Sequence, residues 1–157
     1  RRVSRLTNGS SLATVRKVVS QAELKRALSI RLRVFVQEQG VPRGIELDAD
    51  DQRATHFLAY FVGRAVGTAR VVFSENQAKV GRMAVLKSFR NKGVGRELLK
   101  RTVKLAWKKG ADSIILHAQM PVVGFYEKRG FRCVGRAFME AGIPHRKMVL
   151  ARKFRAI

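Results

Sequence analysis

The chain has 157 residues, of which 46% are hydrophobic, and this is enough for one domain with a buried core. Its 33 Lys and Arg residues against 11 Asp and Glu give a net charge of +22, which favours polyanionic partners such as nucleic acid or a phosphate-rich small molecule. No apolar run reaches the roughly 20 residues that span a bilayer, and one Cys with three scattered His allows no intrachain disulfide and lacks the ligand spacing of a zinc site.

The N-terminal segment 1–12 is basic and polar and contains no acid, so we expect it to be flexible ahead of the core of a single domain, 1–157. It lacks the apolar core of a secretory signal. The lone cysteine, Cys133, favours a reducing compartment. We therefore expect a soluble cytoplasmic protein without a membrane partner, or an organelle-matrix protein if the N-terminus is the remnant of a targeting segment.

The first elements follow this segment. Residues 13–19 alternate in the manner of a strand. Ser20 and Glu23 form a capping box, which predicts a helix from residue 20 to about residue 35. The polar segment 40–53 contains two glycines and a proline and predicts a loop.

Acidic residues gather in and just before this loop. Five of the eleven acids fall within fourteen residues: Glu38, Glu46, Asp48, Asp50 and Asp51. Two interpretations remain open. The cluster could attract a cationic amine and neutralise part of the basic field beside the acceptor site, or it could be an exposed, solvated loop. His56 follows the loop and is a candidate anchor for it.

The remaining segments complete the predicted sheet. They are strands at 55–62, 65–73 and 78–86, a helix at 92–109, a strand at 113–118, a short helix at 122–130 and strands at 131–139 and 145–154. The first three strands have short connections and predict an antiparallel meander, whereas the strand–helix–strand unit that follows predicts parallel pairing. We expect an α/β fold with a mixed, mostly antiparallel sheet of about seven strands and helices on both faces.

The stretch "SFRNKGVGRELLKR" joins a strand to a helix through a turn with two glycines. Such a turn can bind phosphate, because its amides and the helix N-terminus direct unpaired N–H groups at an anion. It is not a Walker loop, since no lysine followed by Ser or Thr comes after a glycine. It is not a dinucleotide fingerprint either, because Leu98 stands where the third glycine is needed. The remaining pattern is Arg90, two spacers, Gly93 and Gly95.

Two motifs together resemble the GNAT family of N-acetyltransferases. Arg90, Gly93 and Gly95 match its [RQ]-x-x-G-x-[GA] pattern. The stretch "GFYEKRGF" is similar to its second signature through these residues: Phe125, Tyr126, Lys128, Gly130 and Phe131. The order of elements extends the resemblance over 13–157. The stretches "RVFVQEQGVP", "ELDADD" and "AGIPHRKM" are similar to a bacterial subgroup typified by the ElaA and YjcF proteins.

The resemblance implies acetyl-CoA as co-substrate, no metal, and two parallel strands that splay apart around the cofactor. The backbone of Met83, Ala84 and Val85 is then expected to pair with the pantetheine arm. The turn is expected to hold the pyrophosphate through Arg90, Asn91, Lys92, Gly93, Val94, Gly95 and Arg96. Gln119 stands where many members carry an Asn, and Phe125 belongs to the aromatic pair. Lys92, or Lys128 and Arg129, would reach the ribose phosphate.

The resemblance also implies direct attack of a primary amine on the thioester. Tyr126 is expected to protonate the leaving thiolate and to contact the cofactor. The strand 80–85 has no Glu or His that could act as base, so Glu38 and the acidic loop are the candidates, with proton loss through water as the alternative. We expect Arg33, Glu38 and His145 on the acceptor side.

Other residues receive structural interpretations. His117 is expected in the core or in the wall of a cleft, and Cys133 as a core thiol. Two further functions remain open beside the enzyme: a basic nucleic-acid-binding module, and a catalytically inactive CoA-binding regulator of the same fold. The net charge also makes non-specific nucleic-acid binding possible, and the C-terminal strands make a homodimer possible.

Overall fold

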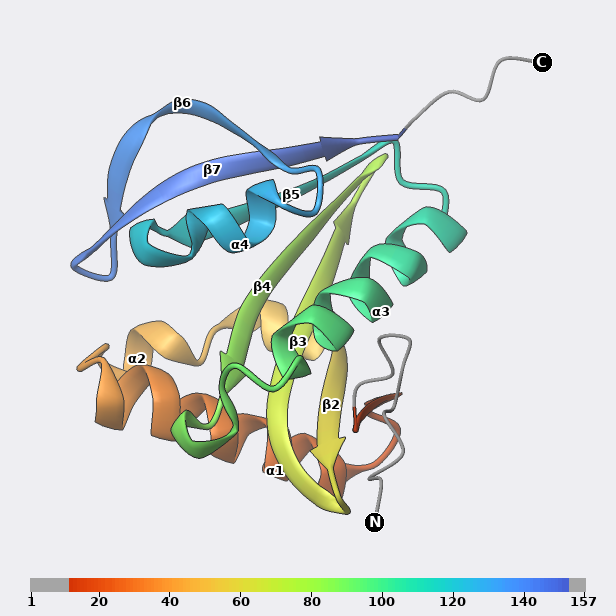
Figure 1. Cartoon of the computed structure of the whole chain (residues 1–157), viewed down its shortest axis with the longest axis vertical. Helices are drawn as coiled ribbons and strands as arrows, with labels where there is room; N and C mark the ends of the chain where they lie inside the picture. The colour runs from red at the N-terminus through yellow and green to blue at the C-terminus, as the bar shows by residue number, and fades with distance from the viewer. Residues whose placement is uncertain (1–11, 153–157) are drawn as a thin grey trace, which may run out of the picture.

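Seven strands form one mixed sheet in residues 12–152, the part of the chain that the structure, a computed structural model, describes (Figure 1). The strand order is β1-β2-β3-β4-β5-β7-β6. The strands are β1 Ala13–Lys17, β2 Thr55–Phe61, β3 Arg64–Ser74, β4 Gln77–Val85, β5 Ser113–Gln119, β6 Arg132–Glu140 and β7 Ile143–Ala151. All pairs are antiparallel except β4 with β5, as the sequence predicts. The predicted flexible segment lies, apart from Leu12, outside the described residues.

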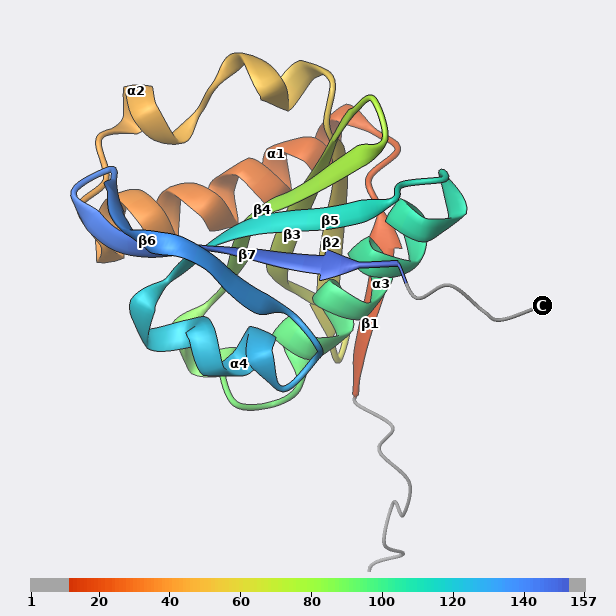
Figure 2. The same ribbon diagram turned by 90° about the horizontal axis from the view of Figure 1, so that it is seen from above.

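The helices cover both faces of the sheet. They are α1 Gln21–Arg31, α2 Arg43–Glu46, α3 Val94–Lys108 and α4 Val123–Glu127, with a π-helix η1 Leu32–Glu38 and 3-10 turns η2 Ala49–Gln52, η3 Lys87–Phe89 and η4 Met120–Val122. Figure 2 shows α1 on one side of the sheet and α3 and α4 on the other. Among residues 12–152, no helix has both the length and the apolar composition to cross a bilayer.

The N-terminal helix begins where the sequence predicts and ends later. The Ser20 hydroxyl accepts the Glu23 amide at 3.1 Å, and the Glu23 carboxylate accepts the Val19 amide at 3.2 Å. The helix continues past residue 35 as η1, in which the Gln39 amide reaches the Val34 carbonyl. This wider winding has no local sequence signal, and the prediction therefore stopped too early.

The predicted loop 40–53 contains α2 and η2, so the prediction of an unstructured loop is wrong in part. The Asp48 side chain accepts the Asp50 amide at 3.1 Å and caps η2. Nε2 of His56 donates a hydrogen bond to the Asp51 carbonyl oxygen at 2.9 Å, which confirms His56 as an anchor of this segment.

The parallel pair splays apart, as the family resemblance implies. Pairing covers only Gln77–Lys79 with Ser113–Ile115, and beyond it β4 pairs only with β3 while β5 pairs with β7. The register of β3 and β4 shifts near Arg82, whose φ of +49° marks an irregular backbone. Such a bulge bends and twists its strand. The sheet therefore opens where β4 and β5 part.

Helix α3 closes one side of this opening. Its buried residues Val94, Leu98 and Ala106 pack on the sheet. Gly67 on β3 permits a close approach, because a Cβ there would lie 3.0 Å from Val94 Cγ1 and 3.1 Å from Leu98 Cδ1. The missing side chain thus sets the position of the first turn of α3 relative to β4.

Candidate functional site

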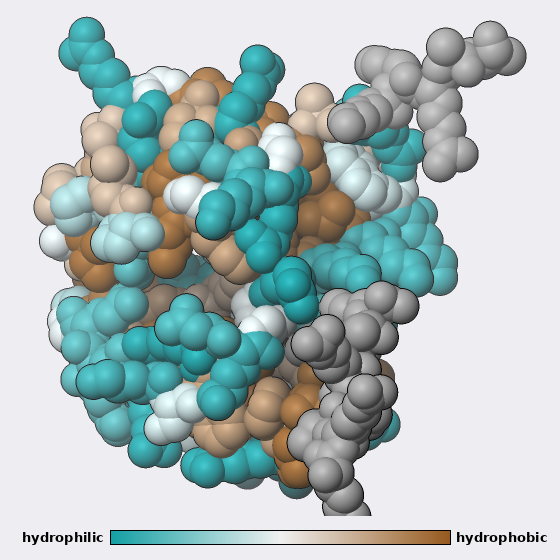
Figure 3. All heavy atoms as spheres, in the orientation of Figure 1, coloured by the Kyte–Doolittle hydropathy of each residue, from teal (hydrophilic) through white to brown (hydrophobic). Residues whose placement is uncertain are grey.

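A cavity of about 1070 Å³ lies where β4 and β5 part. Its walls come from β4, β5, β7, the first turn of α3, α4 and η1. Figure 3 shows the molecular surface hollowed between the layer that contains β6, β7 and α4 and the layer that contains α1 and α2. The size is that of a pocket for a cofactor or a drug-sized ligand.

The glycine-rich turn forms one end of this cavity. Its lining residues there are Arg90, Asn91, Gly93, Val94, Gly95 and Arg96. Gly93 is the N-cap of α3 with a φ of +82°, a conformation that a glycine adopts without strain. The first helical hydrogen bond is donated by the Glu97 amide to the Gly93 carbonyl, so the amides before it have no partner within α3. These N–H groups, with the Arg96 side chain, suit an anion such as pyrophosphate.

Arg90 is bound to protein groups in this structure. Its guanidinium donates to the Val85 carbonyl at 2.9 Å and to both carboxylate oxygens of Glu38. The Arg90 hydrogen bond lowers the pKa of Glu38 more than its burial raises it, and the charges of Arg90 and Lys87 add to the lowering. Glu38 does not belong to the cavity lining. This placement does not favour Glu38 as a general base.

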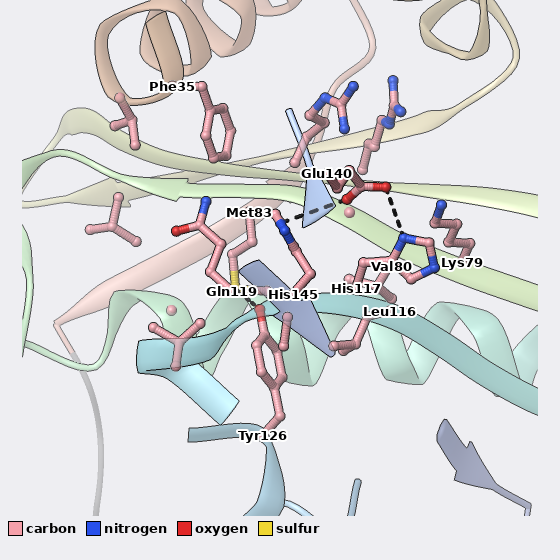
Figure 4. Close-up of a pocket in the computed structure, with 18 of the residues that line it drawn as sticks. Phe35, Lys79, Val80, Met83, Leu116, His117, Gln119, Tyr126, Glu140 and His145 are labelled. Atoms are coloured by element: carbon pink, nitrogen blue, oxygen red, sulfur yellow. Dashed lines mark hydrogen bonds and ion pairs between the residues drawn. The ribbon is translucent and has the colours of Figure 1, made fainter. Parts of the chain in front are cut away.

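Tyr126 faces the cavity from α4 and is 8% exposed. Its hydroxyl lies 3.7 Å from Sδ of Met83 on β4 (Figure 4). Burial raises the pKa of the Tyr126 phenol to about 12, so the hydroxyl keeps its proton at neutral pH. Phe125 beside it packs under the turn, because a Cβ on Gly95 would lie 3.6 Å from its ring. The aromatic pair therefore joins α4 to the turn.

Another wall of the cavity carries a His–Glu–His cluster, which consists of His117, Glu140 and His145 (Figure 4). Glu140 Oε1 lies 3.0 Å from Nδ1 of His117, and Oε2 lies 3.6 Å from Nε2 of His145. Phe138 packs between the two imidazoles, with ring centroids 4.9 Å from His117 and 6.0 Å from His145. All three polar residues line the cavity.

Gln119 ends β5 directly beside this cluster. It is the register partner of His145, and its amide donates to Oε1 of Gln39 at 2.9 Å. His117 and Gln119 are two residues apart on one strand and therefore share a face of the sheet. The contact with Gln39 shows that this face is turned toward the end of η1.

The acidic cluster is bound by arginines. Arg31 pairs with Glu46 at 2.8 Å and with Asp51, and both Arg31 and Glu46 are 1% exposed in their side chains. Arg70 pairs with Asp48 and Asp51, and Arg82 pairs with Asp48 and Glu46. The carboxylates thus neutralise basic residues inside the protein. The expected neutralisation of part of the basic field is therefore present, and an exposed, solvated loop does not describe the buried Arg31–Glu46 pair.

Several expected site residues lie outside the cavity. Arg33 is exposed and lines a separate hollow of about 360 Å³ with neighbours that include Arg26 and Ala65. The side chains of Lys92 and Lys128 are exposed and are not among the lining residues; Lys92 Nζ lies 6.0 Å from the Phe61 ring centre. Ala84 is buried at 3%, between the lining residues Met83 and Val85.

One residue expected near the ribose phosphate lines the cavity, and one lining residue was missed. Arg129 lines the cavity next to Lys128, and its guanidinium stacks 4.0 Å from the Phe125 ring centre. Glu140 was not singled out. The tight turn Ala141–Gly142, with positive φ at both residues, pairs Glu140 with Ile143 and is the signal that could have placed it near His145. Cys133 packs against the core as predicted.

Residues 12–152 contain no group of three or more His, Cys, Asp or Glu side chains that could hold a metal ion. The polar groups of the cavity are instead hydrogen-bond donors and acceptors. At one end they suit an anion, and at the other they suit a cation or an amine.

A family model described as an acetyltransferase (GNAT) domain matches residues 15–152. The N-acetyltransferase YjcF of Bacillus subtilis (strain 168) is 38% identical over 131 residues, which cover 83% of this chain and 94% of YjcF. Protein ElaA of Escherichia coli (strain K12) is 31% identical over 133 residues, which cover 81% of this chain and 86% of ElaA.

Solved structures show the same architecture. The crystal structure of Escherichia coli ElaA superposes with a TM-score of 0.78 at 28% identity and covers 87% of this chain and 98% of that one. A GNAT family acetyltransferase from Elizabethkingia anophelis, solved with acetyl-CoA bound, has a TM-score of 0.68 at 17% identity, covering 91% and 100% of the two chains. At this identity the second likeness shows the fold alone.

Proposed function

The chain belongs to the GNAT family of N-acetyltransferases, and from this membership we propose that it transfers an acetyl group from acetyl-CoA directly to a primary amine. The observation that carries the proposal is that one cavity joins the open N-terminus of α3 to the gap between β4 and β5. The anionic pyrophosphate of acetyl-CoA can therefore lie at the N-terminus of α3, and its pantetheine arm can lie beside it in the gap between β4 and β5. An acyl-enzyme is not required, because both substrates can occupy the same cavity.

The residues present fit the cofactor. The α3 amides and Arg96 suit the pyrophosphate, and the edge of β4 at Met83–Val85 has lost its neighbour β5, so its backbone groups are available to a pantetheine amide. Acetyl-CoA supplies the activated thioester. The protein orients it, excludes water, and keeps the Tyr126 proton available for the departing sulfur.

The part of the cavity near Glu140, where we place the amine, favours a positively charged group, whereas the glycine-rich turn favours an anion. Glu140 presents a carboxylate there, whereas Arg70 and Arg82 are neutralised by their acidic partners. A primary amine suits this region better than an anionic acceptor would. Apolar groups of Val34 and Phe35 border the same part of the cavity and can contact a carbon stem.

The test combines binding with turnover. Acetyl-CoA should raise the melting temperature of the chain by linkage, and a panel of primary amines with thiol detection should show CoA release. Desulfo-CoA with no acetyl group is the control for thioester chemistry. Absence of both a thermal shift and amine-dependent CoA release would overturn the proposal. A thermal shift without release for any amine would favour the inactive CoA-binding regulator.

Nucleic-acid binding is a second candidate because of one observation on α3. Arg96, Lys100, Lys104 and Lys108 are exposed and stand four residues apart, so they form a row along the helix. Such a row suits a phosphate backbone without reading sequence. Duplex DNA should bind at low salt and dissociate at moderate salt, and retention at moderate salt would contradict a purely non-specific contact.

A further inference from the structure

We propose that Glu140 and His145 receive the ammonium group of the acceptor, and that Nε2 of His145 removes its proton before transfer. The inference rests on the proposed function and deepens it, because it names the group that activates the amine. The hydrogen-bond donors and acceptors around the two side chains support this assignment (Figure 4).

The orientation of His145 is fixed by a backbone carbonyl. Nδ1 of His145 lies 2.6 Å from the Ile143 carbonyl oxygen, which can only accept a hydrogen bond. Nδ1 therefore carries the proton. In the neutral ring Nε2 is then a free acceptor, and it is directed at Glu140.

Glu140 is positioned from the other side. Its Oε1 accepts a hydrogen bond from Nδ1 of His117, because an ionised carboxylate has no proton to donate. Phe138 packs against both imidazoles and fills the apolar side of the cluster. His117 acts through Glu140 and is a positioning residue. The second oxygen, Oε2, is left facing His145.

Two hydrogen-bond acceptor atoms, Oε2 of Glu140 and Nε2 of His145, thus lie 3.6 Å apart at the cavity wall. Neither can satisfy the other while the imidazole is neutral. An ammonium group has the donors that both lack, and it can give one N–H to Oε2 and another to Nε2. The same arrangement stabilises the imidazolium that forms when the proton moves to His145.

The charged surroundings keep Glu140 ionised. Burial acts to raise the pKa of Glu140, but the hydrogen bond and charge of His117 on β5, the charge of Lys79 on β4, and that of His145 on β7 whenever its ring is protonated, lower it overall. The carboxylate therefore carries its charge at neutral pH. It can offset both the ammonium and the imidazolium.

The other acidic residues of the cavity are already paired. Glu46 binds Arg31, Asp48 binds Arg70, and Asp50 binds Arg53. Glu38 binds Arg90 and does not line the cavity. Oε2 of Glu140 and Nε2 of His145, both on described lining residues, face each other at 3.6 Å with no donor between them.

The reaction balances with these groups. The ammonium gives one proton to Nε2 of His145, and its nitrogen keeps the freed lone pair. A C–N bond forms to the acetyl carbon as the C–S bond breaks, and the sulfur takes the Tyr126 proton. The second nitrogen proton returns to Tyr126 through solvent, and the imidazolium releases its proton to water. The products are the amide, free CoA and one proton.

The central experiment uses His145→Asn, which keeps a donor for the Ile143 carbonyl and removes the Nε2 base. With an alkyl amine at neutral pH, we expect kcat/KM for the amine to fall by about a hundredfold or more, with unchanged acetyl-CoA affinity. The loss should shrink as the pH rises toward the range in which the amine is already deprotonated. It should also be small for methoxyamine, which is uncharged at neutral pH. A loss independent of pH and of the acceptor would overturn the proposal.

Glu140→Gln and His117→Asn separate the roles of the neighbours. Glu140→Gln should reduce kcat/KM for the amine, because the carboxylate that accepts an ammonium N–H is gone. His117→Asn keeps a donor for Oε1 and should retain most activity. Glu75→Gln, an exposed carboxylate in the β3–β4 turn, is the matched control and should change nothing.

A measurement without substrates tests the premise. The ¹⁵N shifts of the His145 ring in the free protein should report the tautomer with the proton on Nδ1, and the proton on Nε2 would overturn the proposal. If the wild type transfers acetyl to no amine, the proposed function fails. If it transfers and His145→Asn transfers equally well at neutral pH, only the assignment of the base fails.

Discussion

Arg90 and Glu38 form a two-bond ion pair, at 2.8 and 2.9 Å, although 52 residues separate them in the chain. The pair ties the glycine-rich turn to the end of η1. The same guanidinium also binds the Val85 carbonyl at the end of β4. The residue expected to meet the pyrophosphate is therefore held by a protein carboxylate, which competes with the cofactor for it.

This competition predicts the effect of Glu38→Gln. The pair is about one-third exposed on each side, and such pairs contribute at most about 1 kcal/mol. We expect acetyl-CoA affinity to rise by no more than about fivefold, measured by calorimetry, with kcat nearly unchanged. A large fall in kcat at unchanged affinity would instead identify Glu38 as the base.

Tyr126→Phe tests the acid that protonates the thiolate. The hydroxyl is the only atom removed, so packing in the cavity is preserved. We expect kcat to fall by about a hundredfold while acetyl-CoA affinity is retained, as steady-state kinetics and calorimetry would show. Equal turnover by the variant would mean that water supplies this proton.

The same residue predicts a stability change at high pH. The pKa of Tyr126 is raised by burial to about 12, whereas the unfolded phenol ionises near pH 10. The unfolded chain then binds fewer protons between these values, so the free energy of unfolding falls as pH rises from about 10 to 12. Denaturant titrations at pH 9 and about 11 should show a smaller fall for Tyr126→Phe. Parallel curves for both proteins would contradict the burial of the phenol.

Asp51 predicts a stability change at low pH. Its burial acts to raise its pKa, but hydrogen bonds and charges from Arg31 and Arg70, with the Asp48 amide, lower it from 3.8 to about 2. Its contribution, about 2 kcal/mol, is present above pH 4 and is lost as pH falls through about 2. Asp51→Asn should be less stable at neutral pH and should lose less stability on acidification. Urea unfolding at several pH values measures both.

Gly67→Ala tests how the sheet positions the turn. The new Cβ would meet Val94 Cγ1 at 3.0 Å, Leu98 Cδ1 at 3.1 Å and the Ala84 carbonyl oxygen at 3.3 Å. We expect a loss of about 1–3 kcal/mol in stability and weaker acetyl-CoA binding, because the first turn of α3 must shift. Gly44→Ala is the control, since a Cβ there meets nothing within 4 Å. Equal effects of the two variants would contradict this role of Gly67.

The fold could be predicted because its signals are local. Alternation in the strands, the Ser20 capping box and the glycines at 93 and 110 fix the elements within a few residues, and the chain order then limits the topology. The π-helix η1 could not be predicted in this way. It packs against α2 and β4, and its own residues carry no local pattern for the extra residue per turn.

The candidate site could be predicted only where a motif carries it. The turn at 90–96 and the pair Phe125–Tyr126 are contiguous in sequence, and the structure places both on the cavity. Glu140 and His117 meet only because β7 brings the β6–β7 hairpin beside β5. Arg31, Arg70 and Arg82 come from three elements to meet the acidic cluster. Contacts of this kind depend on the assembled sheet and leave no local pattern.

The separation of β4 from β5 bears on how the two substrates of the proposed reaction enter the cavity and how the products leave it. The cavity at the gap is lined by residues of α3 and α4 and by residues of η1 with Gln39. Figure 2 shows α3 and α4 across the sheet from α1, which η1 continues. The two substrates can therefore arrive from opposite sides without crossing, and each product can leave by the route along which its parent entered. Initial-rate plots should intersect, as they do when both substrates must be bound together, and parallel lines would point to a covalent relay.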